Sequence, residues 1–233
     1  MNAEPGTGAV GGPRPQLSEA QEDYLKQIFL LAEGRERVGT QMLARRLGVR
    51  PASVTEMVGR LRDLGLVEHA PYRGVRLSAA GQRVALEMLR HHRLLETFLV
   101  EALGYRWDEV HEEAERLEHV ISERFEARIA EAVGHPTHDP HGDPIPDADL
   151  AMPDGEGWLR LTTMPKGSRG TVVRVGSQDA ASLTTLRRLG LGRGALLEVV
   201  DLEDHAVELE VGGEVLALPE PLAASIWIEE ITL

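Results

Sequence analysis

Between residues 18 and 133, apolar side chains recur at every third or fourth position, and this spacing predicts amphipathic helices. Local chemistry marks their boundaries. Ser18 and Gln21 have the spacing of a capping box, while Pro51 suits a first helical turn and Gly48 suits a helix end. The first three helices are expected to begin at Ser18, Thr40 and Pro51 and to end at Gly34, Gly48 and Gly65.

The segment LVEHAPYRGVRLS follows the third helix and predicts a two-stranded ribbon that turns around Pro71–Gly74. Two short helices joined through Gly48 and followed by such a hairpin are typical of a winged helix-turn-helix. In that module the second helix enters the major groove of DNA. A three-helix module with a hairpin can also be a protein-docking domain, and this alternative stays open on the pattern alone.

Two longer helices follow the ribbon. They are expected from Ser78 to about Leu103 and from Trp107 to about Val133, because the apolar spacing stays helical over both stretches. Prolines and glycines then interrupt residues 134–157, which predicts an extended connection.

From Trp158 onward the pattern changes to short β-branched runs separated by glycine-rich turns. The runs TVVRV, ALLEVV, AVELEV and SIWIEEI predict a small antiparallel barrel with one helical insert at Ala180–Leu189. The fold class is therefore mainly α with a C-terminal all-β domain. The predicted parts are a disordered tail (1–16), a winged helix-turn-helix domain (17–80), a helical domain (81–150), a linker (151–157) and the β domain (158–233).

The composition excludes several classes of protein. The 233 residues include no cysteine, which excludes disulfides, thiolate zinc sites and iron–sulfur clusters. The chain begins without an apolar signal region, and no run approaches the roughly 18 apolar residues of a membrane span. We therefore expect a cytoplasmic protein with no membrane partner.

Acidic charge is concentrated in the middle of the chain. The whole chain has 25 Lys and Arg against 38 Asp and Glu, a formal net charge of −13 that argues against wholesale coating of nucleic acid. Residues 17–80 nevertheless hold ten basic and eight acidic side chains. Residues 81–157 hold seven basic and eighteen acidic side chains, with seven of the nine histidines. Acidic groups combined with imidazoles are ligands for divalent metals.

The start of the third helix and the ribbon carry candidate DNA contacts. Small and hydroxyl side chains can approach base edges closely, and arginines suit phosphates. Glu56 is a misfit in this set, because its carboxylate repels phosphate although it could accept a hydrogen bond from cytosine. The predicted contacts are Arg50, Ser53 and Thr55 near the helix start, Arg60 further along, and Arg73 and Arg76 on the wing.

The segment HEEAERLEH predicts a metal-binding stripe. It places His111, Glu115, Glu118 and His119 at positions i, i+4, i+7 and i+8, which share one face of a helix. Two carboxylates and two imidazoles on one face become favourable when a divalent cation supplies the missing charge. The alternative is a solvated acidic face, which is common on helices.

Further candidate ligands lie on the other predicted helices. His92 and Glu96 repeat the i, i+4 spacing on what we expect to be an adjacent antiparallel helix, which weakens the alternative of a solvated face. Asp23 lies just before the apolar stripe of the first helix. We interpret a third group of histidines as part of the extended connection, because prolines surround them: His135, His138 and His141.

Five segments carry a family resemblance: EDYLKQIFLL, LGVRPASVTEMVGRLRDLGLVEH, YRGVRLSAAG, HHRLLETFL and VHEEAERLEHVIS. Together, from about residue 18 to 150, they resemble the diphtheria-toxin-repressor family of metal-dependent transcriptional repressors, which respond to Fe²⁺ or Mn²⁺. The segment LRRLGLGRGALLEVV resembles the SH3-like (FeoA-like) domain of the longer members. The resemblance implies that residues 81–150 are a dimerisation and metal-binding domain.

Position by position, the resemblance also implies two metal sites. The regulatory site falls on Asp23, Glu115, Glu118 and His119, and the ancillary site falls on His92, Glu96 and His111. Manganese-type members also use the residue matching His92 beside the carboxylates, so the two sites can share it. Longer members add ligands from the SH3-like domain, where Asp179 aligns loosely with one and Ser182 replaces the other poorly.

Two positions bear on the choice of metal. Iron-type members have Met and Cys where this chain has Asp23 and Glu115, and replacing soft sulfur with carboxylate favours the harder Mn²⁺. Manganese-type members with a binuclear site carry Glu where this chain has Lys26, and a protonated lysine cannot ligate. We therefore expect a carboxylate-rich primary site and a separate ancillary site, with one to two or more Mn²⁺ or Fe²⁺ ions per subunit.

The predicted function is a DNA-binding repressor of metal homeostasis that responds to Mn²⁺, with Fe²⁺ as an alternative activating ion, and that is not an enzyme. We expect a homodimer on a palindromic DNA operator, since one winged helix reads about half of such a site. The predicted dimer face comprises Leu86, Leu89, Leu94, Phe98 and Leu99.

Two other functions are compatible with parts of the sequence. A carboxylate/histidine dimetal enzyme is the first alternative, but the chain lacks the two Glu-x-x-His pairs typical of that class. A plain interaction module with an SH3-like tail is the second, and it leaves the His/Glu stripe unexplained.

Overall fold

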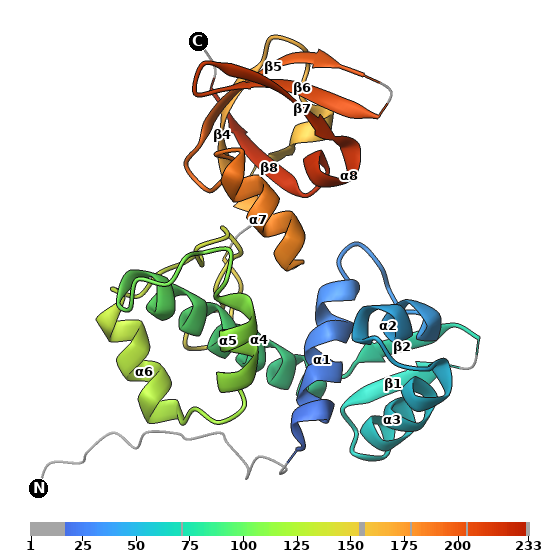
Figure 1. Ribbon diagram of the computed structural model, residues 1–233. Coiled ribbons are helices and arrows are strands. Elements are labelled where there is room, and N and C mark those ends of the chain that lie inside the picture. The colour runs from blue at the N-terminus through green and yellow to red at the C-terminus, as the bar shows by residue number, and fades with distance from the viewer. Residues whose placement is uncertain (1–16, 71, 154–156, 178, 204, 232–233) are drawn as a thin grey trace, which may run out of the picture. The chain divides into compact units, whose positions relative to one another are not determined.

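The computed structural model describes residues 17–70, 72–153, 157–177, 179–203 and 205–231 (Figure 1). The tail predicted at residues 1–16 lies outside these residues. The chain divides into two compact units, Met1–Gln82 and Arg83–Leu233.

The first unit has the order of elements predicted for a winged helix-turn-helix. Its elements are α1 (Glu19–Leu31), α2 (Thr40–Leu47), α3 (Pro51–Asp63), β1 (Val67–Ala70), β2 (Gly74–Leu77) and the first residues of α4 (Ala79–Glu101). β1 and β2 pair antiparallel, with Val67 opposite Leu77. They form the predicted ribbon.

Ser18 and Gly48 have the roles predicted for them, whereas α1 ends at Leu31, before the predicted Gly34, and Gly39 rather than Thr40 is the N-cap of α2. The backbone N–H of Ser18 donates to Gln21 Oε1 at 2.9 Å, and Gly48 ends α2 with a φ of 65°. At Gly74 a Cβ would lie 2.4 Å from the carbonyl oxygen of Val38, so only glycine allows this approach of the wing. The core consists of apolar side chains from all three helices, including Leu25, Ile28, Leu43, Val58 and Leu61.

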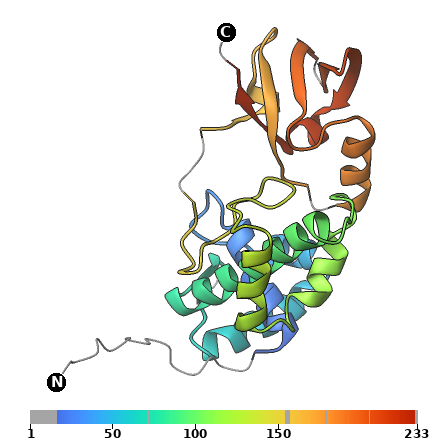
Figure 2. The ribbon, with the colours of Figure 1, turned by 90° about the vertical axis from the view of Figure 1, so that its left-hand side faces the viewer.

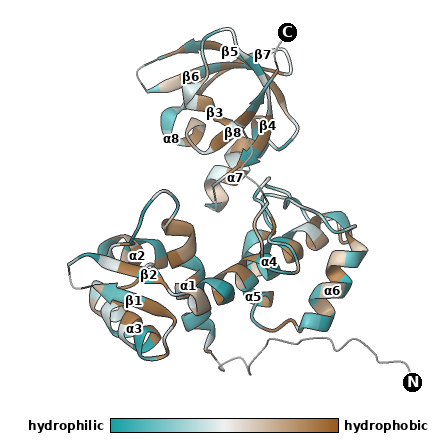
Figure 3. Cartoon of the chain, turned by 180° about the vertical axis from the view of Figure 1, so that it is seen from behind, coloured by the Kyte–Doolittle hydropathy of each residue, from teal (hydrophilic) through white to brown (hydrophobic). Residues whose placement is uncertain are grey.

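The helical part of the second unit comprises the rest of α4, α5 (His111–Leu117) and α6 (Glu123–Ala132). Apolar and polar positions alternate around α4 and α6 (Figure 3). The apolar sides meet in a core that includes Leu94, Leu95, Ala114, Ile129 and Ile145.

The single helix predicted from Trp107 to about Val133 is wrong. The structure has two helices there, and the second begins after Ser122, whose side chain accepts a hydrogen bond from the backbone N–H of Phe125 at 3.3 Å. A serine cap of this kind starts a new helix, and the apolar spacing on either side conceals the interruption. Consequently Glu118 is the C-cap of α5, and His119 lies between the two helices.

The residues predicted for the dimer face are also mostly wrong. Leu86, Leu89, Leu94 and Leu99 are each less than 10% exposed within a single chain, and Phe98 packs against the helical core. Helical spacing of apolar residues identifies the buried side of a helix, but it does not say whether the same chain or a partner covers that side.

The C-terminal part of the second unit is a six-stranded antiparallel sheet (Figures 1 and 2). The strand order is β3-β8-β4-β5-β6-β7. Its elements are β3 (Leu159–Arg160), the 3₁₀ turn η1 (Leu161–Thr163), β4 (Arg169–Val175), α7 (Ala180–Arg188), β5 (Leu196–Leu202), β6 (Ala206–Val211), β7 (Glu214–Pro219), α8 (Glu220–Ala223) and β8 (Ile226–Glu230).

Four of these strands and the helical insert α7 match the predicted runs. α7 contributes Leu183 and Leu186 to the core beneath the sheet. The strand β7 was not predicted. It follows β6 through Gly212 and Gly213, which both have positive φ and allow a tight hairpin turn. Within the described ranges, no helix is both long and apolar enough to cross a membrane.

Candidate metal centre and DNA contacts

The candidate metal centre lies in the second unit, where α4 and α5 meet. His92 and Glu96 are one turn apart on α4 and are both buried. His111 is the first residue of α5, and Glu118 is its C-cap. The fold thus brings together ligands that the sequence predicted on two separate helices.

Three of these donor atoms form a nearly equilateral triangle. His92 Nε2 lies 3.0 Å from Glu96 Oε1 and 3.1 Å from His111 Nδ1, and His111 Nδ1 lies 3.2 Å from Glu96 Oε1. Neighbouring ligand atoms of an octahedral ion with bonds of about 2.1 Å are about 3.0 Å apart. The predicted ancillary residues therefore have the spacing of one face of such a coordination sphere.

The orientation of His92 supports a ligand role. Its Nδ1 lies 2.6 Å from Glu118 Oε2, so an Nδ1–H donates to this buried carboxylate and the lone pair of Nε2 faces the triangle. Metal-binding histidines commonly have this arrangement, in which a second group fixes the tautomer. His92 also links the ancillary set to Glu118, one of the predicted regulatory ligands.

The other predicted regulatory residues are less closely gathered. Glu115 Oε1 lies 3.8 Å from both His92 Nδ1 and His111 Nε2, and His119 Nε2 lies 3.6 Å from Glu118 Oε1. Asp23 is on α1 in the first unit, whereas the other three belong to the second. Their grouping as one regulatory site stays a prediction.

His91, the neighbour of His92 on α4, contacts the backbone of Glu118. Its Nδ1 lies 3.1 Å from the backbone oxygen of Glu118, and its Nε2 lies 3.1 Å from Glu126 Oε2. Burial alone would lower the pKa of His91, but these two partners raise it above its ordinary value. A protonated His91 can donate to both partners at once.

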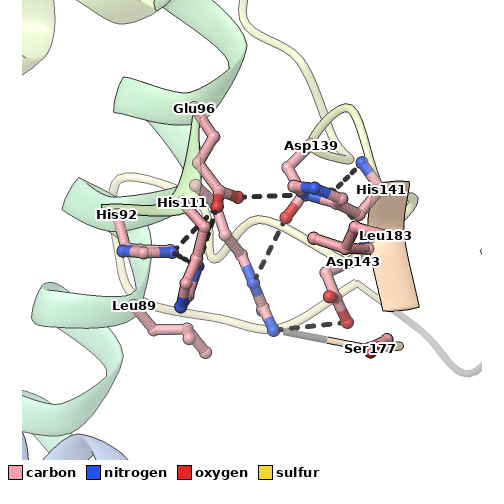
Figure 4. Close-up of a pocket in the computed structure, with 10 residues that line it drawn as sticks. Leu89, His92, Glu96, His111, Asp139, His141, Asp143, Ser177 and Leu183 are labelled. Carbon is pink, nitrogen blue, oxygen red and sulfur yellow. Dashed lines mark hydrogen bonds and ion pairs between the residues drawn. The ribbon is translucent and has the colours of Figure 1, made fainter. Parts of the chain in front are cut away.

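Sequence reasoning missed two buried residues next to this centre, Asp139 and His141. Figure 4 shows both across the Glu96 carboxylate from His92 and His111. His141 Nδ1 lies 3.3 Å from Glu96 Oε2, and one donor atom from each of Glu96, Asp139 and His141 lies within 4.8 Å of the others. The short spacing in DPHGD was the available signal, but the surrounding prolines favoured the interpretation as loop.

Burial and neighbouring carboxylates shift the pKa values of Asp139 and His141. Burial raises the pKa of Asp139 to about 7, with help from nearby Asp143 and Glu96. Burial alone would lower the pKa of His141, but Glu96 and the two aspartates raise it to about 9. Both groups hold protons more tightly than usual, Asp139 because it is buried beside other carboxylates and His141 because carboxylates surround it.

In the SH3-like part, the loosely aligned Asp179 and Ser182 both lie at the start of α7. Asp179 caps α7, and its Oδ2 accepts a hydrogen bond from the backbone N–H of Ser182 at 2.9 Å. Ser177, two residues earlier, lines the same pocket as Glu96 and His141. Asp179 thus acts as the N-cap of α7.

The predicted DNA contacts lie on α3 and the wing of the first unit. Arg50, Thr55, Arg60, Arg73 and Arg76 are exposed, and Ser53 is half-buried. Two of the arginines have carboxylate partners.

Arg60 pairs with Glu56 at 2.6 Å, and Arg76 pairs with Glu68 at 2.6 Å. The misfit Glu56 is thus a surface partner of Arg60. Such exposed pairs are weak, so they leave both arginines available to phosphate.

Three family models match successive parts of the chain. The first is described as iron dependent repressor, N-terminal DNA binding domain, and it matches residues 16–75. The second is described as iron dependent repressor, metal binding and dimerisation domain, and it matches residues 78–147. The FeoA domain matches residues 159–230. The predicted order of domain types is confirmed.

Relatives and solved structures match over nearly the whole chain. The iron-dependent repressor IdeR of Mycobacterium tuberculosis is 32% identical over 93% of this chain and 99% of its own length. The diphtheria toxin repressor of Corynebacterium diphtheriae is 30% identical over 92% of this chain and 99% of its own length.

A solved manganese-dependent transcriptional repressor in complex with manganese superposes with a TM-score of 0.84, at 40% identity over 91% of this chain and all of that chain. The structure of ScaR with bound Zn²⁺ gives a TM-score of 0.78, at 33% identity over 91% of this chain and 99% of that chain.

Proposed function

The chain belongs to the iron-dependent repressor family, and from this premise we propose that it is a repressor whose binding to DNA requires Mn²⁺, with Fe²⁺ as a second activator. One observation carries the choice of a hard or intermediate metal. The distances between His92 Nε2, His111 Nδ1 and Glu96 Oε1 match those between neighbouring ligand atoms of an octahedral ion, and none of these atoms is sulfur. The protein would act on operators of metal-homeostasis genes, in the cytoplasm.

We assign two metal sites, and the donor atoms of the first lie closer together than those of the second. The ancillary site consists of His92, Glu96 and His111. The regulatory site consists of Asp23, Glu115, Glu118 and His119. An ion bound by a residue of α1 and by residues around α5 would restrict the position of the DNA-binding domain, and this restriction would favour the arrangement that fits an operator.

The absence of thiolate supports manganese over softer ions. The sequence contains no cysteine, and every assigned ligand is a carboxylate or an imidazole. Such ligands accept Mn²⁺ and Fe²⁺ readily, whereas sulfur would shift the preference to softer metals. The relatives named above are repressors, so they lend no support to the dimetal enzyme alternative.

A DNA-binding assay under anaerobic conditions tests the proposal. The probe is a duplex selected from a random library by the Mn²⁺-loaded protein, and its affinity is compared in chelator, Mn²⁺, Fe²⁺ and Mg²⁺. We expect tight, sequence-specific binding with Mn²⁺ and Fe²⁺, and weak binding in the other two conditions. Equal affinity in chelator and Mn²⁺ would contradict metal control.

The wing arginine Arg73 provides a prediction about DNA contact. Arg73→Ala should weaken binding to all duplexes to a similar extent and reduce the slope of log affinity against log salt by about 1, since this exposed arginine lies in the turn of the wing, where we propose that it contacts a phosphate. Arg62→Ala removes the same charge from a position outside the predicted contact set, and it should leave the salt slope unchanged. The slope of log affinity against log salt is measured for both variants, and an unchanged slope in Arg73→Ala would contradict a phosphate contact by Arg73.

The oligomeric state provides another prediction. A chain with a dimerisation domain and one winged helix should be a homodimer at protein concentrations of tens of micromolar, because a palindromic operator binds two DNA-binding domains. Sedimentation with and without Mn²⁺ measures this directly. A monomer under both conditions would contradict the prediction.

A further inference from the structure

The turn of the wing contains a tyrosine in an unfavourable backbone conformation. The backbone N–H of Arg73 donates to the carbonyl oxygen of Ala70 at 3.0 Å and closes the turn between β1 and β2. Tyr72, inside this turn, has a φ of 63°. Glycine adopts such a φ readily, whereas a residue with a Cβ adopts it at a cost in conformational energy. The turn would therefore form more easily with glycine at this position.

The side chain of Tyr72 does not offset this cost by packing in the fold. It is fully exposed, at 108% of its reference area. Among the described residues of the first unit, the other exposed large apolar side chains are those of Val49 and Leu64, which are 38% and 49% exposed. A strained residue whose ring has no part in the core is characteristic of a functional site.

The base of the wing is fixed to the rest of the first unit. Val38 and Val75 exchange two backbone hydrogen bonds, of 2.8 and 2.9 Å, and Gly74 lies directly against the backbone of Val38. Across the ribbon, Arg76 pairs with Glu68 at 2.6 Å. A side chain at the end of a ribbon that is held in this way has less freedom to lose when it binds a partner.

The groove geometry of DNA indicates what such a ring could contact. A minor groove adjoins the major-groove segment that a recognition helix occupies, and elements outside that helix commonly enter it. In the minor groove, A·T and T·A pairs display only the acceptors N3 and O2, whereas a G·C pair adds the exocyclic amino group of guanine. A ring at the floor of the groove fits the first two pairs and is obstructed by this amino group.

We propose that the ring of Tyr72 enters the minor groove beside the segment occupied by α3 and favours A·T pairs there. The phenolic O–H can donate to the acceptors on the groove floor, so the hydroxyl adds affinity and the ring adds the preference. The neighbouring Arg73 would contact a phosphate, which carries no sequence information. The proposal rests on the proposed function, because it requires the first unit to bind DNA.

Substituting base pairs in the flanks of the duplex selected by the Mn²⁺-loaded protein tests the proposal. An inosine·C pair resembles G·C in the major groove but lacks the amino group in the minor groove. We expect similar affinities for A·T and inosine·C flanks, and an affinity lower by about fivefold or more for G·C flanks. Equal affinity for all three flanks, or grouping of inosine·C with G·C, would overturn the proposal.

Variants of Tyr72 show whether its ring is responsible for the preference. Tyr72→Gly should bind all three flanks equally, with the affinity that the unaltered protein has for the G·C flank. Tyr72→Phe keeps the ring, so it should keep the preference and bind every flank more weakly. Leu64→Ala is the control, since it removes another exposed apolar side chain of the first unit. A preference that survives in Tyr72→Gly, or that is lost in Tyr72→Phe or Leu64→Ala, would contradict the assignment.

Thermal unfolding without DNA provides a second, independent readout. The Tm of Tyr72→Gly should be at least as high as that of the unaltered protein, because glycine suits the φ of 63° and no packing contact of a buried side chain is lost. Opposite effects on folding and on DNA binding are expected only if the ring serves binding. A lower Tm would show that the ring supports the fold, and it would overturn the argument from strain.

Failure of this inference and failure of the proposed function have different signatures. Equal DNA affinity with and without Mn²⁺ in the unaltered protein overturns metal control, while the comparison of flanks still decides the role of Tyr72. Activation by Mn²⁺ together with an unaltered flank preference in Tyr72→Gly overturns the role of Tyr72 alone. A protein that binds no duplex under any condition overturns both.

Discussion

Asp23→Ala should abolish the activation of DNA binding by Mn²⁺ while the protein remains a dimer. Asp23 is on α1 in the DNA-binding unit, whereas Glu115, Glu118 and His119 belong to the other unit. Loss of the one proposed ligand from the DNA-binding unit leaves the ion bound to the dimerisation domain alone. Removing even a supporting group around a metal costs about 10–100-fold in affinity, so we expect a shift of at least about 100-fold in the Mn²⁺ concentration needed for half-maximal DNA binding.

Thermodynamic linkage sharpens this test. If Mn²⁺ raises the affinity for operator DNA, operator DNA must raise the affinity for Mn²⁺ by the same factor. Titrating Mn²⁺ with and without the selected duplex should show this factor in the unaltered protein and not in Asp23→Ala. Glu19→Ala removes an exposed carboxylate from the same helix and should behave like the unaltered protein. Full activation of Asp23→Ala would exclude Asp23 as a ligand.

The extent to which the sequence predicts this protein depends on how local each feature is. The helices of the first unit follow from apolar spacing and from residues such as Ser18 and Gly48, which act within a few positions of themselves. The pair His92 and Glu96 follows in the same way, because one helical turn fixes their neighbourhood. The contact between this pair and His111 needed the additional expectation that two helices pack together.

Features that depend on distant contacts were not predictable. His141 faces Glu96 because the backbone of residues 139–143 takes a particular path against β4. Gly142 has a φ of 88°, and a Cβ there would lie 1.9 Å from the backbone oxygen of Val173. No periodicity of residues 134–157 encodes that approach. The break at Ser122 was missed because the apolar spacing continues across it, although the serine itself is a helix-cap residue.

Glu115→Cys should change the metal preference of the protein from Mn²⁺ toward softer ions. Glu115 has a partly exposed side chain 3.8 Å from His92 Nδ1 and from His111 Nε2, so a substitution there alters the donor set with little effect on the core. A thiolate prefers Zn²⁺ and other soft or borderline ions over Mn²⁺. We expect the Mn²⁺ needed for half-maximal DNA binding to rise by at least about 10-fold, and the response to Zn²⁺ to increase.

In the unaltered protein, Zn²⁺ should bind and yet activate less than Mn²⁺ at equal occupancy. Zn²⁺ is satisfied by four ligands and can take them from Glu115, Glu118, His119 and water, so it need not recruit Asp23. The relative affinities of the two metals do not test this prediction, because Zn²⁺ generally binds more tightly than Mn²⁺ to nitrogen and oxygen donors whichever metal activates better. DNA affinity is therefore measured at matched occupancy for both metals, in the unaltered protein and in Glu115→Cys.

Glu112→Cys is the control for the new thiol, because it places a cysteine on an exposed position of the same helix. It should show the metal response of the unaltered protein. Equal activation by Zn²⁺ and Mn²⁺ in the unaltered protein would mean that coordination number does not select the DNA-binding state. The control of DNA binding would then have to depend on the charge of the ion, which the two metals share, and not on the recruitment of Asp23.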